Sequence, residues 1–299
     1  FQKQAFLKEK QMNELTYPSF LESDMDPPLP ENAKFHILPV PYEKSTSYGE
    51  GTVRGPSAIL NASQQLELFD GHSIPAEEGI YTHLPVDCDL PEETVLAEIA
   101  EQIGKIHHAG HIPVMLGGEH TVTYGAIKAL HDAGEKFGII QFDAHADLRS
   151  EYEGTKWSHA CVMRRAVEMG IPLCQIGVRS LSLEDLEIRV ENAIMHYDME
   201  ETVEKGLDMS LVLDNFPEKV YVTFDVDALD PSIMPGTGTP EPGGMQWYPA
   251  LKILNHIARR CEVIGFDVVE VSPMAGSNIS EFTAARLAYN FMGMIARRE

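Results

Sequence analysis

The chain has 299 residues, of which 43% are hydrophobic, and its formal net charge is -23. This length suits one three-layer α/β domain, and the negative charge disfavours a nucleic-acid partner because phosphate binding needs Lys and Arg. No uninterrupted apolar run approaches the roughly 18 residues of a membrane helix, and the start of the chain lacks the apolar core of a signal peptide. We therefore expect a cytoplasmic protein that binds neither membranes nor nucleic acids, with its four separated cysteines reduced.

The first 32 residues are expected to form an arm and a linker outside the domain. An amphipathic run at residues 6–15 precedes a proline-rich passage at residues 26–30, which is typical of an extended linker. Residues 33–299 are then expected to form a single domain.

Eight apolar runs predict eight strands, and helical patterns lie between most of them. Strands that alternate with helices predict a mostly parallel sheet covered on both faces, that is, a three-layer αβα sandwich. Behind the first run, residues 42–54 carry Gly49, Gly51 and several hydroxyls without a helical period, which indicates a loop above the sheet edge. The predicted strands span residues 35–40, 79–82, 112–116, 137–142, 173–178, 193–196, 220–224 and 263–269. One predicted helix begins at Gly55, and the others span residues 92–108, 120–131, 159–169, 248–260 and 280–297.

Three polar clusters follow directly after predicted strands. Asp143, His145 and Asp147 occupy alternating positions, so an extended backbone would point all three side chains in one direction. Residues 117–120 (GGEH) and 225–227 (DVD) each follow another predicted strand. In open α/β sheets, ligands bind beyond the carboxyl ends of the strands, so we expect the clusters to converge there. Two histidines and four aspartates are more candidate ligands than one catalytic metal usually takes, which predicts a pair of metals.

The donor types indicate which metal to expect. Carboxylates combined with imidazoles favour a borderline divalent ion such as manganese over calcium, which prefers oxygen ligands alone. The lack of thiolates in these clusters disfavours structural zinc. Two such ions about 3.5 to 4 Å apart can lower the pKa of a shared water toward neutrality, which provides a nucleophile for a poor electrophile.

Three stretches of the chain resemble the ureohydrolase family, which contains arginases and agmatinases. They are residues 116–123 (LGGEHTVT), 139–149 (IIQFDAHADLR) and 223–244 (TFDVDALDPSIMPGTGTPEPGG), and the resemblance extends from about Phe35 to the end of the chain. It implies an arginase/deacetylase-like catalytic domain with two Mn²⁺ per subunit that hydrolyses guanidinium groups to urea and an amine. Carried over position by position, the implied metal ligands are His120, Asp143, His145, Asp147, Asp225 and Asp227.

The resemblance also implies residues that handle the proton and the substrate. Asp147 is the implied acid for the leaving amine, and His159 matches the proton-shuttle histidine of the family. Glu270 ends a buried strand, where a carboxylate is costly without a cation, and it is implied to hold the guanidinium. Thr239 matches a hydroxyl that touches the guanidinium, and Asp267 is expected to orient a ligand histidine. A helix cap for His159 and a turn residue for Thr239 are the structural alternatives.

The loop after the central motif bears on the choice of substrate. Glu151 and Glu153 would repel a carboxylate and attract a terminal ammonium as substrate-binding residues, whereas Arg149 could pair with a carboxylate if it faced the site. We therefore expect agmatine, converted to putrescine and urea in polyamine synthesis, with arginine, aminopropyl-agmatine and guanidino acids as alternatives. A deacetylase-like hydrolase with one zinc and a non-catalytic metal-binding protein are further alternatives. The family also implies a homo-trimer or homo-hexamer.

Overall fold

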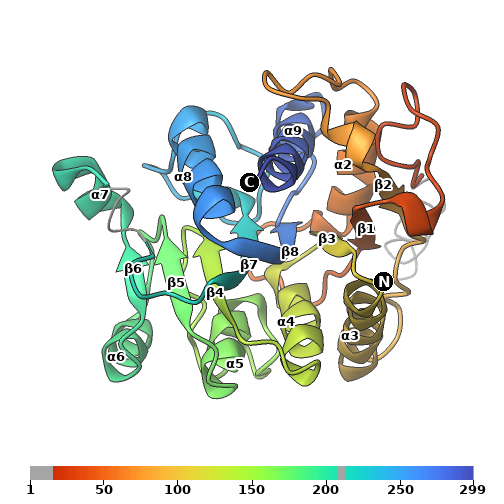
Figure 1. Ribbon diagram of the computed structural model, residues 1–299. Helices are drawn as coiled ribbons and strands as arrows, with labels where there is room; N and C mark the ends of the chain where they lie inside the picture. The colour runs from red at the N-terminus through yellow and green to blue at the C-terminus, as the bar shows by residue number, and fades with distance from the viewer. Residues whose placement is uncertain (1–15, 208–212, 299) are drawn as a thin grey trace.

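The computed structural model describes residues 16–207 and 213–298. Its centre is an eight-stranded sheet in the order β2-β1-β3-β8-β7-β4-β5-β6, and every paired strand runs parallel to its neighbour. Helices α3, α4, α5 and α6 cover one face of the sheet, and α2, α8 and α9 cover the other (Figure 1). The predicted three-layer αβα sandwich is confirmed, with a sheet that is parallel throughout.

The bounds of the elements agree closely with the apolar runs. The strands are β1 (Phe35–Val40), β2 (Ile80–Thr82), β3 (Ile112–Gly117), β4 (Phe137–Phe142), β5 (Leu173–Ile176), β6 (Met195–Tyr197), β7 (Lys219–Asp225) and β8 (Glu262–Val269). The helices are α2 (Gly55–Ser63), α3 (Glu92–His108), α4 (Thr123–Asp132), α5 (Val162–Glu168), α6 (Leu183–Glu191), α7 (Met199–Lys205), α8 (Trp247–Arg260) and α9 (Ile279–Ala296). The helices expected from residues 120 and 159 each begin with a 3-10 turn, so their α-helical parts start three residues later.

The central strands explain where a site can form. Strands β1 and β4 are buried along their whole length, and β3, β7 and β8 are buried except at their first residue, because helices cover both faces. In the order β3-β8-β7-β4, four parallel neighbours end at the same edge of the sheet. Polar residues that follow these strands are therefore brought together from distant parts of the sequence.

Residues 16–32 lie against the domain. Phe20 and Leu21 are buried in its hydrophobic core, and the backbone N–H of Leu21 donates to Oγ of Ser63, 3.2 Å away. The hydroxyl of Ser57 donates to the carbonyl of Thr16 at 2.6 Å. This part of the chain is thus fastened to α2 by apolar burial and by hydrogen bonds. The amphipathic run expected at residues 6–15 lies outside the described residues.

Three histidines gather around the first strands of the sheet. His36 on β1 is buried, its Nδ1 lies 2.9 Å from Nε2 of His83, and the ring of His111 stacks on it with centroids 4.1 Å apart. Its Nε2 lies 3.0 Å from the carbonyl oxygen of Pro30. Burial lowers the pKa of His36 to about 4, and the neighbouring His111 and His83 act in the same direction. The imidazole of His36 is therefore neutral at neutral pH.

All four cysteines are free thiols, and three of them are buried. Within residues 16–207 and 213–298, no helix has the length and apolar character needed to cross a membrane.

Candidate functional site

The turn after β3 requires glycine. A Cβ on Gly118 would lie 2.0 Å from the carbonyl oxygen of Tyr42, so any side chain at this position would collide with the backbone. The N–H of Gly118 donates to Val40 at 2.8 Å, and the N–H of Glu119 donates to Tyr42 at 2.9 Å. This close approach of two backbone segments places His120 at the start of the turn that leads into α4.

Two groups of potential metal ligands meet at the carboxyl ends of β3, β4 and β7. In each group the ligand atoms lie within 4.8 Å of one another, and the groups are His120, Asp143 and Asp147, and Asp143, His145 and Asp227. Asp143 belongs to both groups, so its carboxylate lies between them. Asp225 lies beside the first group, with Oδ2 at 3.4 Å from Nδ1 of His120. The six residues implied by the family resemblance are thus brought together.

The electrostatics of these groups fit divalent cations. Nδ1 of His120 is buried without a hydrogen-bond partner among the described residues, and it faces Oδ2 of Asp143 and Oδ2 of Asp147, each at 3.1 Å. Burial and then the neighbouring Asp143 raise the pKa of Asp147 to about 7. Burial, followed by the charges of Asp227 and Asp143, raises the pKa of Asp225 well above its usual range. Buried carboxylates that repel one another in this way are the chemistry that metal cations compensate.

The opposite ring nitrogen of His120 is held by a hydroxyl. Nε2 lies 2.8 Å from Oγ1 of Thr223, which donates to Oδ1 of Asp267 at 2.7 Å. Asp267 is fully buried and also accepts from the hydroxyls of Tyr221 at 2.8 Å and Thr123 at 2.9 Å. Asp267 therefore acts on His120 through Thr223, and this chain of hydrogen bonds orients the imidazole toward the carboxylates.

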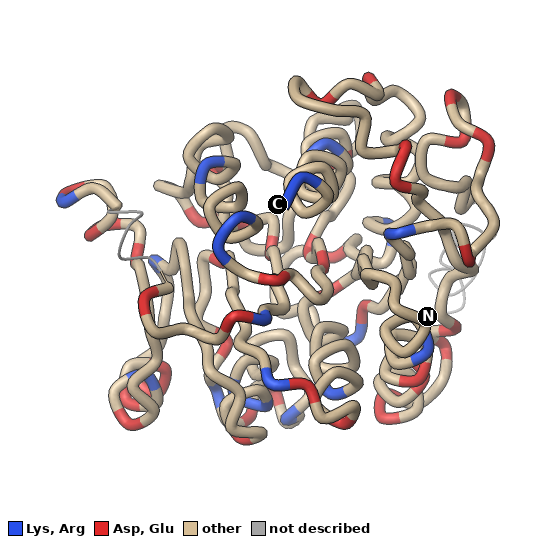
Figure 2. Tube along the Cα trace, in the orientation of Figure 1, with Lys and Arg blue, Asp and Glu red and all other residues tan. Residues whose placement is uncertain are grey.

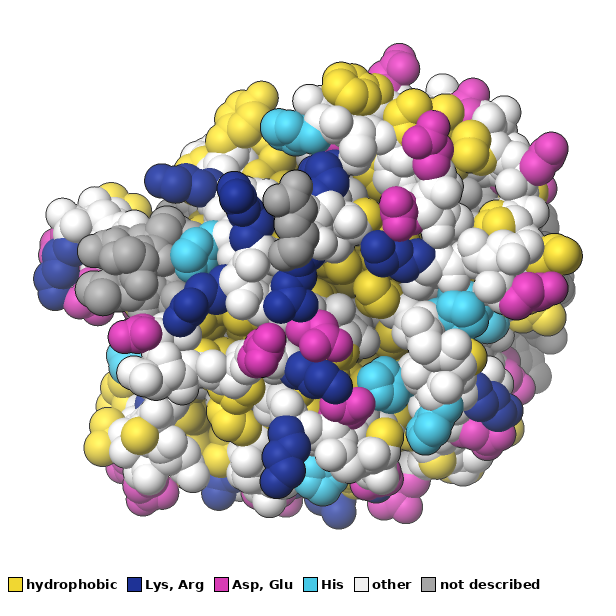
Figure 3. Space-filling view, viewed as in Figure 1, with side chains coloured by type: hydrophobic (Ala, Val, Ile, Leu, Met, Phe, Trp, Pro, Cys, Tyr) yellow, Lys and Arg dark blue, Asp and Glu magenta, His cyan; other side chains and the backbone are white. Residues whose placement is uncertain are grey.

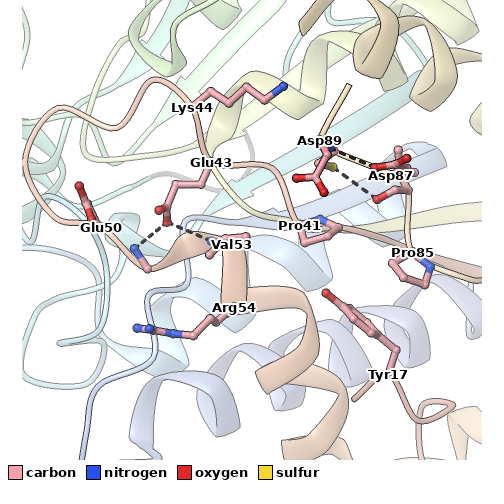
Figure 4. A pocket seen from close by; sticks show the side chains of 13 residues that line it. Tyr17, Pro41, Glu43, Lys44, Glu50, Val53, Arg54, Pro85, Asp87 and Asp89 are labelled. Atoms are coloured by element: carbon pink, nitrogen blue, oxygen red, sulfur yellow. Dashed lines mark hydrogen bonds between the residues drawn. The ribbon is translucent and has the colours of Figure 1, made fainter. Parts of the chain in front are cut away.

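Two carboxylates, the partly buried Glu43 and the buried Glu119, fasten the loop that follows β1. Glu43 accepts hydrogen bonds from the N–H groups of Gly51 at 2.6 Å and Val53 at 3.0 Å, as Figure 4 shows. Glu119, which is 0% exposed, accepts from the N–H of Ser45 at 2.8 Å and from its hydroxyl at 3.0 Å. These bonds close residues 43–53 into a loop. One side of the loop lines the metal-ligand groups, and the other side lines a cavity of about 630 Å³ (Figure 4).

His159 lies beneath this loop. Its N–H donates to Oγ of Ser45 at 3.1 Å, its Nδ1 lies 3.4 Å from the same oxygen, and its Nε2 lies 3.5 Å from Oγ of Ser47. The ring of Tyr152 meets it edge-on, with centroids 6.0 Å apart. Burial lowers the pKa of His159 to about 4, and the nearby His120 and His145 lower it further. The imidazole is therefore neutral at neutral pH.

Glu270 and Asp147 have strained backbones. Their φ angles are 67° and 54°, in the left-handed region that side chains other than glycine rarely adopt. Oε1 of Glu270 accepts a hydrogen bond from the N–H of His120 at 2.7 Å. Burial, followed by the charge of Glu119, raises the pKa of Glu270 well above its usual range. This backbone conformation directs both carboxyl groups into the site. Its conformational free-energy cost is offset by the packing of the surrounding residues.

A narrow cavity of about 20 Å³, roughly the size of one water molecule, lies between these residues. Thr239 lines it and has Oγ1 at 3.5 Å from Oδ2 of Asp227. The described lining residues are Thr46, Ser47, Tyr48, Gly49, His120, His145, Asp147, His159, Asp225, Asp227, Gly238, Thr239 and Glu270.

The residues expected to bind the substrate in the loop after the central motif lie outside the cavity lining. Glu151 and Glu153 are exposed and do not line the cavity, although Tyr152 between them contacts His159. The guanidinium of Arg149 lies over the ring of Tyr152, 5.1 Å from its centroid, and does not line the cavity.

Sequence reasoning did not identify Ser45, Ser47 or Glu119 as members of the site. The available signals were the hydroxyl-rich loop at residues 42–54 and the carboxylate inside the GGEH motif.

Comparisons with known proteins agree with this geometry. The family model described as "Arginase family" matches residues 33–293. The N(1)-aminopropylagmatine ureohydrolase of Synechocystis sp. is 38% identical over 267 residues, which cover 86% of this chain and 87% of the relative. The agmatinase of Pyrococcus horikoshii is 35% identical over 295 residues, which cover 94% of this chain and 99% of the relative.

Among solved structures, the agmatine ureohydrolase of Thermoplasma volcanium is similar with a TM-score of 0.83 and 26% identity. The match covers 96% of this chain and 97% of that one. The resemblance expected from the three motifs is confirmed by sequence and by fold. Because the family model and the relatives both span most of its length, the chain belongs to the arginase family.

Proposed function

We propose that the protein is a binuclear manganese ureohydrolase that cleaves the guanidinium group of an aminoalkyl guanidine to urea and an amine. The composition of the cavity carries this proposal. Its lining residues include four carboxylates and three histidines but, within the described part of the chain, neither Lys nor Arg. With Asp147, Asp225 and Asp227 engaged by the metals, Glu270 remains as the carboxylate for a cationic substrate, and the described lining offers no cationic side chain to an α-carboxylate. The family assignment disfavours the deacetylase-like alternative.

The metal would be held by the two groups of ligands that share Asp143, together with Asp225. When bound, a pair of divalent cations supplies an activated water as the nucleophile. Glu270 and Thr239 are proposed to bind the substrate guanidinium. One carboxylate oxygen of Glu270 is already engaged by the N–H of His120, which leaves the other oxygen for the cation.

Two residues are proposed to move protons. Beside its role as a metal ligand, Asp147 would pass a proton to the nitrogen of the leaving amine. His159 would exchange a proton with solvent through Nε2. The hydroxyls of Ser45 and Ser47 lie beside its two ring nitrogens and support its orientation.

Agmatine is the proposed substrate, with putrescine as the product and polyamine synthesis in the cytoplasm as the setting. N(1)-aminopropylagmatine is the second candidate, because a relative named for that substrate is 38% identical. Glu151 and Glu153 flank Tyr152, which contacts His159, and we propose that they attract the terminal ammonium of the substrate. We also propose that the chain forms a homo-trimer or homo-hexamer.

Urea release by the purified protein tests the proposal. The protein is stripped with a chelator, reloaded with Mn²⁺ and assayed, and the matched control is Asp225→Asn, which replaces a charged ligand with a neutral amide. We expect urea from the manganese-loaded wild type, little from the stripped protein, and low metal content together with low activity in the variant.

The substrate is decided by kcat/KM for agmatine, N(1)-aminopropylagmatine, arginine and guanidinobutyrate measured side by side. A preference for either carboxylate-bearing compound would contradict the proposed substrate class. A fully metal-loaded wild type that releases urea from none of the four would indicate a non-catalytic metal-binding protein.

A further inference from the structure

A groove runs between α8 and the end of α9 on the face shown in Figure 3. Its main cavity has a volume of about 1110 Å³, and an adjoining cavity of about 430 Å³ shares Lys252 and Arg259 with it. We call the two together the α8–α9 groove. Trp247, Tyr248, Lys252, Arg259, Arg297 and Arg298 are among its lining residues.

The charge of this groove is opposite to that of the protein. The chain has 46 acidic and 23 basic residues, and five of those basic residues line the groove: Lys252, Arg259, Arg260, Arg297 and Arg298. Figure 3 shows Lys and Arg side chains gathered over this region. The dipoles of α8 and α9 account for the arginines near the ends of these helices but not for Lys252, which lies in the first half of α8.

Most of these cations are poorly compensated. Lys252 and Arg259 are exposed, and within residues 16–207 and 213–298 neither forms an ion pair with a carboxylate. Arg260 and Arg298 have their paired carboxylates at 3.8 and 3.9 Å. Only Arg297 is closely paired, with Asp70 at 2.6 Å. The groove therefore offers positive charge to an anionic partner.

The other lining groups indicate a protein as that partner. Tyr248 is 79% exposed, and Trp and Tyr beside Arg are the residue types enriched where protein interfaces bind most tightly. Oδ1 of Asn290, which also lines the groove, is buried without a hydrogen-bond partner in the described structure. The main cavity is larger than the roughly 300 to 1,000 Å³ of common small-molecule pockets.

We propose that the α8–α9 groove receives helix α7 of a second copy of the chain. Helix α7 lies beyond β6 at the outer edge of the sheet (Figure 1), and Figure 2 shows acidic positions along it. It exposes Glu200 and Glu204, one helical turn apart, and Val203, which is 74% exposed. Glu201 is already paired with Lys205 at 2.6 Å. The exposed carboxylates thus complement the groove in charge, and Val203 complements its apolar side chains.

The contact joins two different surfaces, so it is heterologous. Repetition of such a contact closes into a ring when the rotation permits, as in a trimer. This inference rests on the proposed homo-oligomer and names the surfaces that hold it together.

A charge-reversal cycle tests the proposal by light scattering and sedimentation of the full-length, manganese-loaded protein. The groove variant is Lys252→Glu with Arg259→Glu, the helix variant is Glu200→Lys with Glu204→Lys, and the fourth protein carries all four substitutions. We expect each double variant to need at least about 100-fold more protein to assemble, because like charges then face one another across the contact. The fourfold variant restores opposite charges and should assemble again.

The matched control is Glu187→Lys with Glu191→Lys on α6, which reverses two exposed charges at the same spacing as those of α7. We expect the control to assemble as the wild type does. Circular dichroism and denaturant unfolding establish that each variant is folded. If the groove variant is not, Lys252→Gln with Arg259→Gln takes its place and should weaken assembly in the same direction.

The outcomes distinguish the proposed oligomer from the proposed contact. A monomeric wild type would refute the proposed oligomer and this contact with it, without bearing on urea release. An oligomeric wild type whose assembly withstands both reversals would refute the contact alone and would assign the groove to a different anionic partner. Failure of the fourfold variant to recover would refute the pairing of the groove with α7.

Discussion

Replacement of Thr223 by valine tests the chain of hydrogen bonds behind His120. The substitution keeps the shape of a fully buried side chain but removes the hydroxyl that lies 2.8 Å from Nε2 of His120 and 2.7 Å from Asp267. The imidazole loses its support, and Asp267 keeps only the hydroxyls of Tyr221 and Thr123. Loss of such a support typically lowers metal affinity about 10- to 100-fold.

The stability of the fold should change as well. A hydrogen bond to a charged group contributes about 1.5 to 3 kcal/mol, and an unsatisfied buried N–H costs about 1 to 3 kcal/mol. We therefore expect Thr223→Val to lower the free energy of unfolding by about 4 kcal/mol, the middle of the range of about 2.5 to 6 kcal/mol to which these two contributions sum. Mn²⁺ titration followed by calorimetry measures the affinity, and urea denaturation of the metal-free protein measures the stability.

Thr237→Val is the matched control. The hydroxyl of Thr237 is buried without a hydrogen-bond partner in the described part of the chain, so its removal should cost little in either measurement. If Thr223→Val binds Mn²⁺ as tightly as the wild type, the hydrogen-bond chain does not orient His120 and the reasoning is wrong.

Three further predictions concern the metal, the histidine cluster and the substrate. Chelation should lower the melting temperature, because removal of the cations leaves buried carboxylates that repel one another, as the raised pKa values of Asp147 and Asp225 indicate. Calorimetry that finds equal melting temperatures with and without Mn²⁺ would contradict this. The native pKa of His36, about 4, is below the ordinary value of about 6.5, so the unfolded chain binds more protons and stability should fall as pH drops between these values. His36→Gln should flatten that fall in denaturant midpoints, and an unchanged slope would exclude His36 as its source. Glu270→Gln should retain its metal by elemental analysis but lose at least about 100-fold in kcat/KM, whereas Glu151→Gln should chiefly raise KM for N(1)-aminopropylagmatine. Wild-type kinetics in Glu270→Gln would make that residue structural.

Much of the architecture follows from apolar periodicity. Eight runs of apolar residues predicted the eight strands, and polar residues directly behind three of them predicted where the ligands converge. Helices α6 and α7 were not singled out, because both are short and rich in charged residues. Helix α6 is stabilised by the capping box at Ser182, whereas α7 has no side-chain cap, and an apolar period predicts neither helix.

The detailed arrangement of the ligands was harder to predict from the sequence. Alternation along an extended strand placed Asp143, His145 and Asp147 in one direction, but β4 ends at Phe142 and Asp147 adopts a left-handed φ of 54°. Consequently His145 groups with Asp227, whereas Asp147 groups with His120. This division depends on a local change of backbone direction, for which the sequence carries no periodic signal.

Long-range contacts explain the residues that sequence reasoning missed. Glu119 and Ser45 are 74 positions apart and meet only because the turn after β3 approaches the loop after β1. The hydrogen bonds that place Ser45 against His159 span 114 positions.

In the loop at residues 43–53, the groups that fix the backbone are different from the side chains that face the cavity. Glu43 and Glu119 fasten it through backbone N–H groups and through the hydroxyls of Ser45 and Thr52, and neither binds the side chains at positions 46–48 that face the cavity. Every residue type except proline carries the backbone donor that such anchoring needs. Substitutions at positions 46–48 therefore change the surface that a substrate meets while the loop keeps its course. Single exchanges at these three positions would thus alter the shape and polarity of the cavity wall without replacing a metal ligand beneath it.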